Sequence, residues 1–178
     1  MKFKHITAIK NEITKIIDNS QEIKRYCTYL SDSPLSQKGK LENGTFIQQP
    51  NINKSLINEN IMPYSFSLEL ISEHKSMIFI YNAYGDLRGK VIGDNVLAID
   101  ILCTAQQNIL SGIGEERITS IADIITDLID SERANKSLTN IVVGKYQFDR
   151  LWKDNHYIVL TLLCDFSTSN MRRWFNGY

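Results

Sequence analysis

One short glycine-containing stretch comes close to a phosphate-binding loop. It runs Gly85-Asp86-Leu87-Arg88-Gly89-Lys90-Val91, whereas a P-loop needs G-x-x-x-x-G-K followed by a Ser or Thr whose hydroxyl binds magnesium. The stretch is one residue too short, and Val91 stands where that hydroxyl belongs. Backbone amides in a loop of this length cannot cradle a β-phosphate, so we interpret the stretch as a glycine-rich hairpin loop.

A second stretch has the spacing of a metal-dependent nuclease. Glu73-His74-Lys75 carries the Glu-x-Lys pattern that such enzymes place on a strand, next to a further carboxylate that shares the metal ion. The only upstream candidates for that carboxylate are Glu59 and Glu69, and no aspartate precedes the triplet across the hairpin. Such triplets arise by chance in a chain rich in Lys and Glu, so nuclease activity through Glu73 and Lys75 is a minor alternative.

The other residue types that perform catalysis do not form a recognisable constellation. The sequence has no Gly-x-Ser-x-Gly elbow, and its histidines show no pairing at ligand spacing; they are His5, His74 and His156. Three aspartates, at positions 123, 127 and 130, lie opposite the apolar stripe of an expected helix and are interpreted as a solvated face. We therefore expect no enzyme, and we predict no catalytic residue, no cofactor-binding residue, no metal ligand and no cofactor.

Composition indicates one globular domain without a strong field. The 178 residues are 43% hydrophobic and 22% charged, and 20 basic residues balance 20 acidic ones. A neutral chain does not recruit nucleic acid or an anionic membrane by bulk charge. The three cysteines are far apart and are interpreted as reduced core residues, and no apolar run reaches the ~20 residues of a membrane span. Lysines interrupt the N-terminus where a signal peptide needs an apolar run, so we expect an intracellular or virion protein.

The apolar periodicity predicts an α+β fold. Residues 1–30 form a helical segment, and 64–166 form the α+β core. Within that core we expect alternating strands from Tyr64 onward, turn residues at 83–86 together with 88–89, a buried central strand at 96–103, a helix from Gly114 to Asp130, and an antiparallel pair at 141–148 and 157–166. The sheet is antiparallel or mixed, has about four to five strands, and is packed on one face by an N-terminal helix and a central helix.

Two segments of the chain lack this periodicity. Residues 31–63 hold all three prolines and scattered apolar side chains, and are either an extended arm across a neighbouring surface or a mobile loop. The tail, 167–178, is rich in Arg and aromatic residues, which dominate interface hot spots; it folds back on its own core, docks on another chain or stacks on nucleic acid. The predicted interface residues of the two segments are Phe46, Ile47, Arg172, Arg173, Trp174, Phe175 and Tyr178.

The order of elements resembles a known family. The residues that carry the resemblance are Met62-Pro63-Tyr64-Ser65, the strand Val-Leu-Ala-Ile-Asp-Ile-Leu-Cys at 96–103, the helix that starts Glu116-Arg117-Ile118, and the closing strands with Lys-Tyr-Gln-Phe at 145–148 and Tyr-Ile-Val-Leu-Thr-Leu-Leu-Cys-Asp-Phe at 157–166. This pattern is similar to the small tail-completion, tail-terminator and neck proteins of tailed bacteriophages. It covers residues 63–166 and, more loosely, the first helix.

The resemblance implies a structural virion protein of the head–tail junction. It implies a homo-oligomeric ring of six or twelve copies that contacts the portal or adaptor on one side and the tail on the other, or that terminates the tail tube. DNA passes through the channel of such a ring without sequence-specific contacts. The location is the virion, and the host cytoplasm before assembly. The alternatives are a non-catalytic intracellular adaptor or binding module and the nuclease described above.

Overall fold

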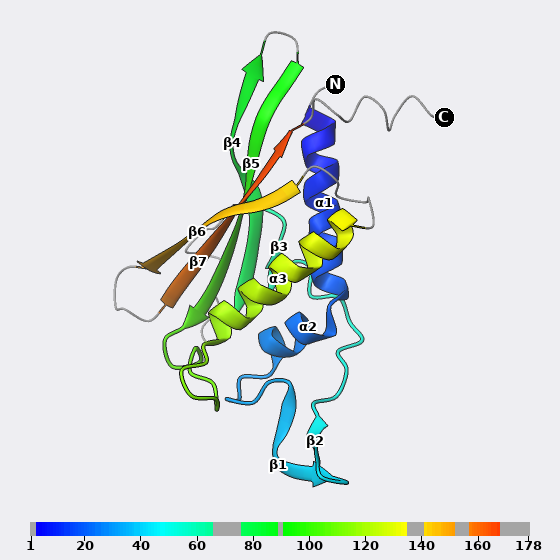
Figure 1. The fold of residues 1–178 in the computed structure, drawn as a ribbon, viewed down its shortest axis with the longest axis vertical. Coiled ribbons are helices and arrows are strands. Elements are labelled where there is room, and N and C mark those ends of the chain that lie inside the picture. The colour runs from blue at the N-terminus through cyan, green and yellow to red at the C-terminus, as the bar shows by residue number, and fades with distance from the viewer. Residues whose placement is uncertain (1–2, 66–75, 89–90, 135–140, 152–156, 168–178) are drawn as a thin grey trace.

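The computed structural model of the chain describes residues 3–65, 76–88, 91–134, 141–151 and 157–167. Ten helices and strands are defined within these ranges (Figure 1). They are α1 (Phe3–Asn19), α2 (Gln21–Thr28), β1 (Ser36–Glu42), β2 (Thr45–Gln48), β3 (Ile61–Met62), β4 (Met77–Arg88), β5 (Val91–Thr104), α3 (Arg117–Ala134), β6 (Ile141–Leu151) and β7 (Tyr157–Ser167).

The helices form where isoleucines recur every three or four residues. In α1 this spacing buries Ile6, Ile9, Ile13 and Ile17 on one side, and in α3 it buries Ile118, Ile121, Ile125 and Ile129. A capping serine separates α1 from α2: the Ser20 hydroxyl accepts a hydrogen bond from the backbone N–H of Ile23 and so satisfies a donor that the first turn of a helix leaves free.

The main sheet is mixed and has five strands in the order β3-β4-β5-β7-β6. β3 pairs parallel with β4, and the other three pairings are antiparallel. The predicted central strand is confirmed: β5 lies in the middle of the sheet and is apolar on both faces because both faces are buried. The predicted α+β class is confirmed as well.

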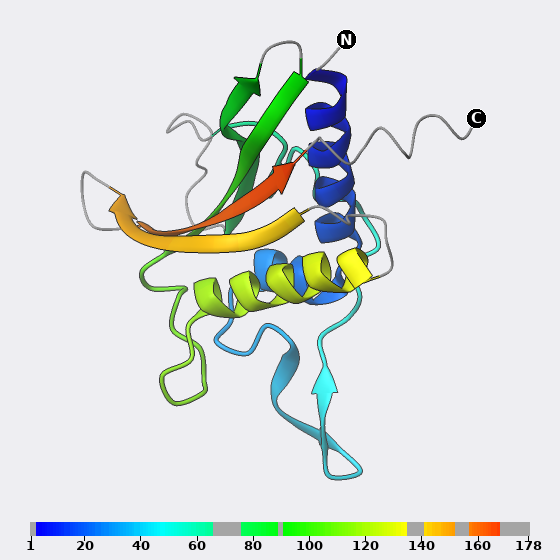
Figure 2. The ribbon, with the colours of Figure 1, turned by 45° about the horizontal axis from the view of Figure 1, so that its top comes forward.

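All three helices cover one face of this sheet (Figures 1 and 2). The main core lies between them and is built from the isoleucine stripes and from alternate residues of β4, β5 and β7. The opposite face carries a smaller cluster of Met62, Met77, Phe79, Leu102 and Val159. The face that a residue occupies therefore follows the two-residue period of each strand.

A buried carboxylate lies on the second face of the sheet. The Asp100 side chain accepts hydrogen bonds from the Tyr81 hydroxyl at 2.9 Å and from the Thr161 hydroxyl at 2.7 Å. Burial and the Asp100 carboxylate both raise the pKa of Tyr81. The three strands β4, β5 and β7 are thus joined by a polar contact that satisfies the charge inside the sheet.

Residues 31–63 divide into two parts with different surroundings. Residues 36–48, here called the hairpin, form the two-stranded sheet β1–β2 that projects from the body of the molecule (Figure 1). Its turn is Asn43-Gly44, both with positive φ, which is the geometry of the tightest two-residue hairpin loops. Residues 49–63, here called the strap, return across α1 and α2 and end in β3.

Two expectations for the region between β3 and β5 need comment. The turn predicted over 83–86 and 88–89 is wrong for its first part, because β4 continues through 83–86 and Gly85 pairs with Asn95 of β5; β4 ends at Arg88 and β5 begins at Val91, so the connection falls at 89–90, outside the described residues. A Cβ at Gly85 would lie 2.2 Å from the Asn95 side chain, so the glycine serves a close cross-strand approach rather than a turn. The predicted strand from Tyr64 to Leu70 lies almost entirely outside the described residues.

Candidate interaction surfaces

The hairpin is exposed on both of its faces. Leu41 and Phe46 stand directly opposite each other on β1 and β2, and each is 59% exposed. Ile47, the other predicted interface residue of this segment, is half-buried. A two-stranded hairpin is at best marginally stable alone in water, and this one leaves an apolar cross-strand pair in solvent. That combination is typical of a surface completed by a partner.

Hydrogen bonds at the base hold the hairpin in a defined direction. The Lys38 ammonium lies 2.6 Å from the Asp32 carboxylate, and this hydrogen bond holds the pKa of Asp32 below its ordinary value. The Ser111 backbone N–H donates to the Asp32 carbonyl at 2.9 Å, and the Gln49 N–H donates to the Leu35 carbonyl at 2.9 Å. The Ser111 bond therefore attaches the segment before β1 to the body, and the Gln49 bond ties the two ends of the hairpin to each other.

A buried arginine fixes the chain that leads into the hairpin. The Arg117 side chain is 0% exposed and donates to four backbone carbonyls, those of Tyr26, Tyr29, Ser31 and Gln107, at 2.6 to 2.9 Å. Two of these carbonyls belong to the C-terminal end of α2, where the helix dipole favours a cation. Burial lowers the pKa of the Arg117 guanidinium. Arg117 therefore joins the start of α3 to the end of α2.

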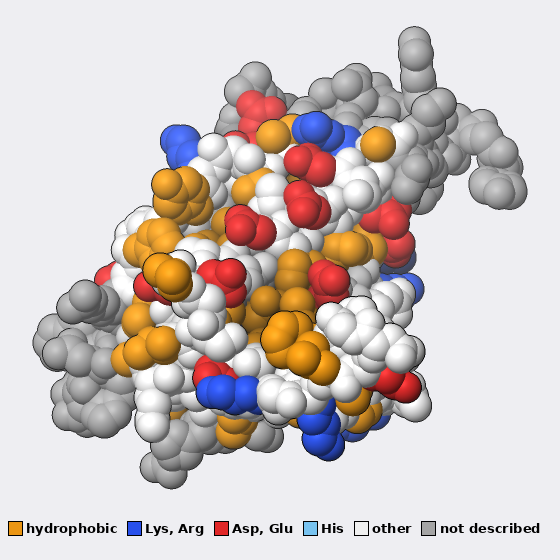
Figure 3. Space-filling model, turned by 60° about the horizontal axis from the view of Figure 1, so that its bottom comes forward, with side chains coloured by type: hydrophobic (Ala, Val, Ile, Leu, Met, Phe, Trp, Pro, Cys, Tyr) orange, Lys and Arg blue, Asp and Glu red, His pale blue; other side chains and the backbone are white. Residues whose placement is uncertain are grey.

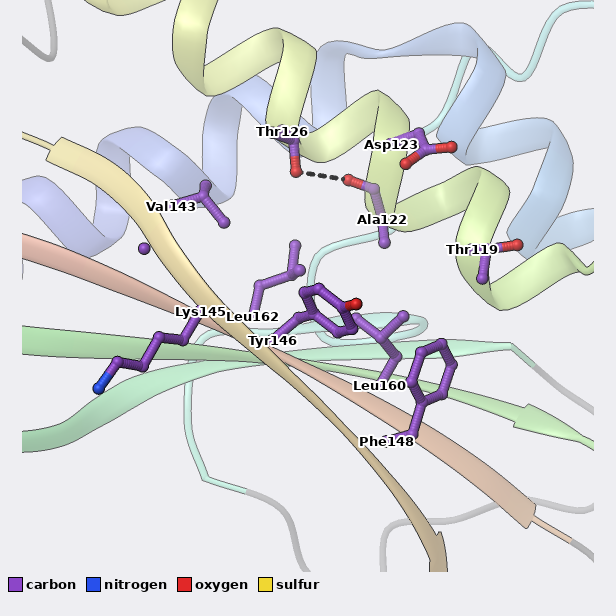
Figure 4. A pocket seen from close by; sticks show the side chains of 11 residues that line it. Thr119, Ala122, Asp123, Thr126, Val143, Lys145, Tyr146, Phe148, Leu160 and Leu162 are labelled. Atoms are coloured by element: carbon purple, nitrogen blue, oxygen red, sulfur yellow. Dashed lines mark hydrogen bonds between the residues drawn. The ribbon is translucent and has the colours of Figure 1, made fainter.

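A groove runs between α3 and the edge of the main sheet (Figure 4). Its volume is about 480 Å³, and its floor is formed by Leu160 and Leu162 of β7, which are almost fully buried. Tyr146 and Phe148 of β6 line the open side; they are 70% and 49% exposed, and their rings meet edge to face at 6.0 Å. α3 contributes Thr119, Ala122, Asp123 and Thr126.

The strand beside this groove forms the edge of the sheet. Within the described ranges β6 pairs only with β7, so the backbone groups on its outer side have no strand partner there. An edge of this kind is a ready template for pairing with another strand. Gly144 interrupts the register between Val143 and Lys145, and an exposed lysine follows the bulge. Bulges and edge lysines restrict which strand can pair.

Charged residues mark the two sides of the groove. Asp123, Asp127 and Asp130 are exposed on α3, which confirms the prediction of a solvated acidic face. On the face shown in Figure 3, acidic side chains alternate with apolar ones over the middle, and Lys and Arg side chains lie toward its margins. The Lys145 ammonium points away from α3 (Figure 4). The groove is therefore apolar inside and charged at its rim.

The thiols lie in the core, as predicted. Cys27, Cys103 and Cys164 are free and buried. Burial raises the pKa of all three, to about 11 for Cys103 and about 12 for Cys164, so they stay protonated near neutral pH and react slowly. Among the described residues, no three His, Cys, Asp or Glu side chains gather in a way that could hold a metal ion. No described helix is long and apolar enough to cross a membrane.

Several predicted site residues lie outside the described part of the chain. They are the nuclease candidates Glu73, His74 and Lys75, the carboxylate Glu69, and the tail residues Arg172, Arg173, Trp174, Phe175 and Tyr178. Glu59, the other upstream carboxylate, forms an ion pair with Lys54 within the strap. Phe46 and Ile47 lie on the hairpin.

The sequence reading missed two features of these surfaces. The sequence predicts only a strand for the groove residues Tyr146 and Phe148. Two aromatic residues that alternate along one strand of the final antiparallel pair could have indicated an exposed edge of the sheet. The hairpin turn at Asn43-Gly44 was overlooked, although this dipeptide is the strongest short-range signal for a hairpin. The Asn43-Gly44 dipeptide is a local signal, so recognising the hairpin turn required no knowledge of the tertiary structure.

Comparison with known proteins supplies the family. The YomW family model matches residues 9–166, which include all three helices and all seven strands except the first residues of α1 and the last of β7. The chain belongs to the YomW family. The family name is that of a Bacillus phage-derived protein and suggests a phage-related chain. No curated protein matches it.

Proposed function

We propose that the protein is a structural component of the phage virion at the head–tail junction. It assembles as a ring of six or twelve copies that joins the portal or adaptor to the tail or terminates the tail tube, and it acts without catalysis or a cofactor. The phage-derived family name supports the setting, and the order of elements resembles small tail-completion, tail-terminator and neck proteins.

The observation that carries the proposal is the exposed hairpin. Its apolar pair, Leu41 and Phe46, remains in solvent while its base is tied to the body by hydrogen bonds and by the Lys38–Asp32 pair. An apolar projection held in a fixed direction is suited to contact with a neighbouring subunit, because little conformational entropy is lost on binding. Ring proteins need such a contact in every copy.

The tail is the second proposed contact. Residues 167–178 contain two arginines and three aromatics, the residue types that carry most binding energy at protein interfaces. Deleting residues 168–178 should abolish incorporation into the ring while the domain still folds, since the predicted core ends before the deleted segment. If virions assembled on the truncated protein join heads to tails normally, the tail has no docking role.

The first test is an affinity purification of the tagged protein from its native lysate, read by mass spectrometry. We expect portal, adaptor or tail-tube subunits to co-purify in fixed ratios. The matched control is the same protein with Phe46→Ser, which should fold but recover fewer of these subunits. Recovery of the bare protein, or of metabolic or nucleic-acid-processing partners, would overturn the virion proposal. In that case the binding-module alternative and a nuclease assay of Glu73→Ala would follow.

A further inference from the structure

We propose that strand β1 of one copy adds to the free edge of β6 in the next copy, antiparallel, with Leu41 opposite Tyr146. This inference rests on the proposed ring and names the two surfaces that would join its subunits. Three features of the described residues support it: a donor strand that lacks a covered face, an acceptor edge that lacks a second strand neighbour, and a register in which their side chains match.

The acceptor edge offers both backbone and side-chain contacts. The outer side of β6 has no strand partner among the described residues, and addition of a strand to such an edge supplies main-chain hydrogen bonds, while pockets for alternate side chains supply specificity. The groove is such a pocket. Tyr146 and Phe148 project into it from the edge strand, over Leu160 and Leu162 of β7.

The donor strand has the matching properties. Residues 38–42 of β1 are exposed, and within the described residues β1 pairs only with β2, which leaves its other edge open. Leu41 shares one face of the hairpin with Phe46, because the two are directly paired. If Leu41 enters the groove, Phe46 follows it on the same face, and both leave water.

The antiparallel register with Leu41 opposite Tyr146 also matches the charges. It places Glu42 opposite Lys145, on the face of the sheet away from the groove, where the Lys145 ammonium points (Figure 4). Lys145, the exposed lysine of the edge strand, is thus paired with the Glu42 carboxylate. The regular part of β1 that this register uses ends at Lys40, because Gly39 has a positive φ and the strand is irregular between Ser36 and Leu41. Shifting the register by one residue would turn Leu41 away from the groove.

The contact requires a second copy. The hairpin projects from one end of the molecule, and β6 lies at the edge of the main sheet away from it in both ribbon views (Figures 1 and 2). In the structure the hydrogen bonds at its base hold the hairpin in a direction away from its own β6. Since donor and acceptor are different surfaces, the interface is head-to-tail, and such interfaces build rings when the rotation closes.

The test is cross-linking between two variants of the full-length protein that each carry one added surface cysteine. Glu42→Cys and Lys145→Cys are mixed and oxidised; we expect a covalent dimer in the mixture and almost none from either variant alone. Wild-type protein controls for the three buried thiols, and Glu42→Cys mixed with Ile113→Cys, a fully exposed position, controls for random collision. A mixture that gives no more dimer than this control overturns the proposal.

Other occupants of the edge give distinguishable results. Dimers of Glu42→Cys alone would mean that hairpins pair with each other, and dimers of Lys145→Cys alone would mean that two β6 edges pair. Cross-linking that appears only after residues 168–178 are deleted would mean that the tail covers the edge in the full chain. Each of these outcomes overturns the proposed contact.

Charge reversal tests the register. Glu42→Lys or Lys145→Glu alone places like charges opposite each other and should weaken association roughly three- to tenfold, whereas the double variant should restore it. If each single variant weakens association and the double variant does not restore it, the pairing of Glu42 with Lys145 is contradicted. The two proposals can fail separately. If head–tail subunits co-purify with the protein but this cross-link does not form, only the proposed interface is wrong. If the cross-linked ring forms but no such subunits co-purify, only the virion role is wrong.

Discussion

The hairpin and the strap come from one stretch of low periodicity, yet they have opposite surroundings. In the strap, Leu56 is 1% exposed, and its backbone N–H donates to the Asp18 carboxylate at 2.7 Å. In the hairpin, Phe46 is 59% exposed, and among the described residues its strand pairs only with β1. Both segments contain apolar residues without a helical or strand period, so the pattern alone does not separate them.

The difference lies in what the helices offer to each segment. Polar side chains of α1 and α2 bind the strap backbone: Gln21 both donates to and accepts from Ile52, and the Lys24 ammonium donates to the Lys54 carbonyl at 2.7 Å. The strap has no long strand and therefore no ladder of strand-to-strand hydrogen bonds. These side-chain bonds satisfy its backbone groups instead. In the hairpin, β1 and β2 satisfy each other's inner backbone groups, and no side chain of α1 or α2 is needed to hold that ladder. One segment completes the fold, and the other is available for contact.

Among the substitutions that test the difference between strap and hairpin, Arg117→Ala is expected to change stability most. The change leaves four buried carbonyls without their donor and should cost about 3–5 kcal/mol of unfolding free energy, measured by urea denaturation. Arg117→Lys should recover little, because an ammonium cannot reach carbonyls spread over Tyr26, Ser31 and Gln107. A loss below about 1 kcal/mol in the alanine variant would mean that α2 and the hairpin base hold together without this side chain.

A matched pair of alanine variants compares the strap with the hairpin. Leu56→Ala empties a buried site and should lower the unfolding free energy by about 2–5 kcal/mol. Phe46→Ala removes an exposed ring and should change it by less than about 0.5 kcal/mol while reducing association between copies. Equal losses of stability in the two variants would contradict the distinction drawn here.

A further prediction concerns the pH dependence of stability. Burial raises the pKa of Cys27, Cys103 and Cys164 in the folded chain, above the ordinary thiol value of about 8.5. Folding therefore favours the neutral thiols: this contribution is complete below about pH 8.5 and is lost as pH rises toward the folded values, by about 1.4 kcal/mol per pH unit and thiol. Urea denaturation under reducing conditions at pH 7.5 and 9.5 should show the loss.

A single replacement tests whether the thiols cause this pH dependence of the unfolding free energy. Cys164→Ala removes one of the three titrating thiols and should make stability less dependent on pH by about one third, whatever it costs at pH 7.5. An unchanged slope would assign the alkaline loss to other groups. The hairpin contains no cysteine, so association through it should not follow this profile.

Much of the fold could be predicted from local patterns. The isoleucine spacing of α1 and α3 and the doubly apolar run of β5 each follow from one period and one environment. The predicted turn begins too early in the chain because Gly85 has two uses, a turn or a close approach to a cross-strand side chain, and only Asn95 on the neighbouring strand decides between them. The groove could not be predicted, because its two walls are separate in the chain and both read as ordinary amphipathic elements.

By itself, the sequence determined which residues would be helical, which strand would be central and that the thiols would be core residues. Each of these depends on the period of apolar side chains along a short segment, which is a local property. Only the tertiary structure decided that Leu56 is buried while Phe46 is exposed, and that β6 is an edge with a groove beside it. Those properties depend on which elements pack against one another, because the helices that bind the strap are drawn from other parts of the chain and leave nothing to cover the hairpin.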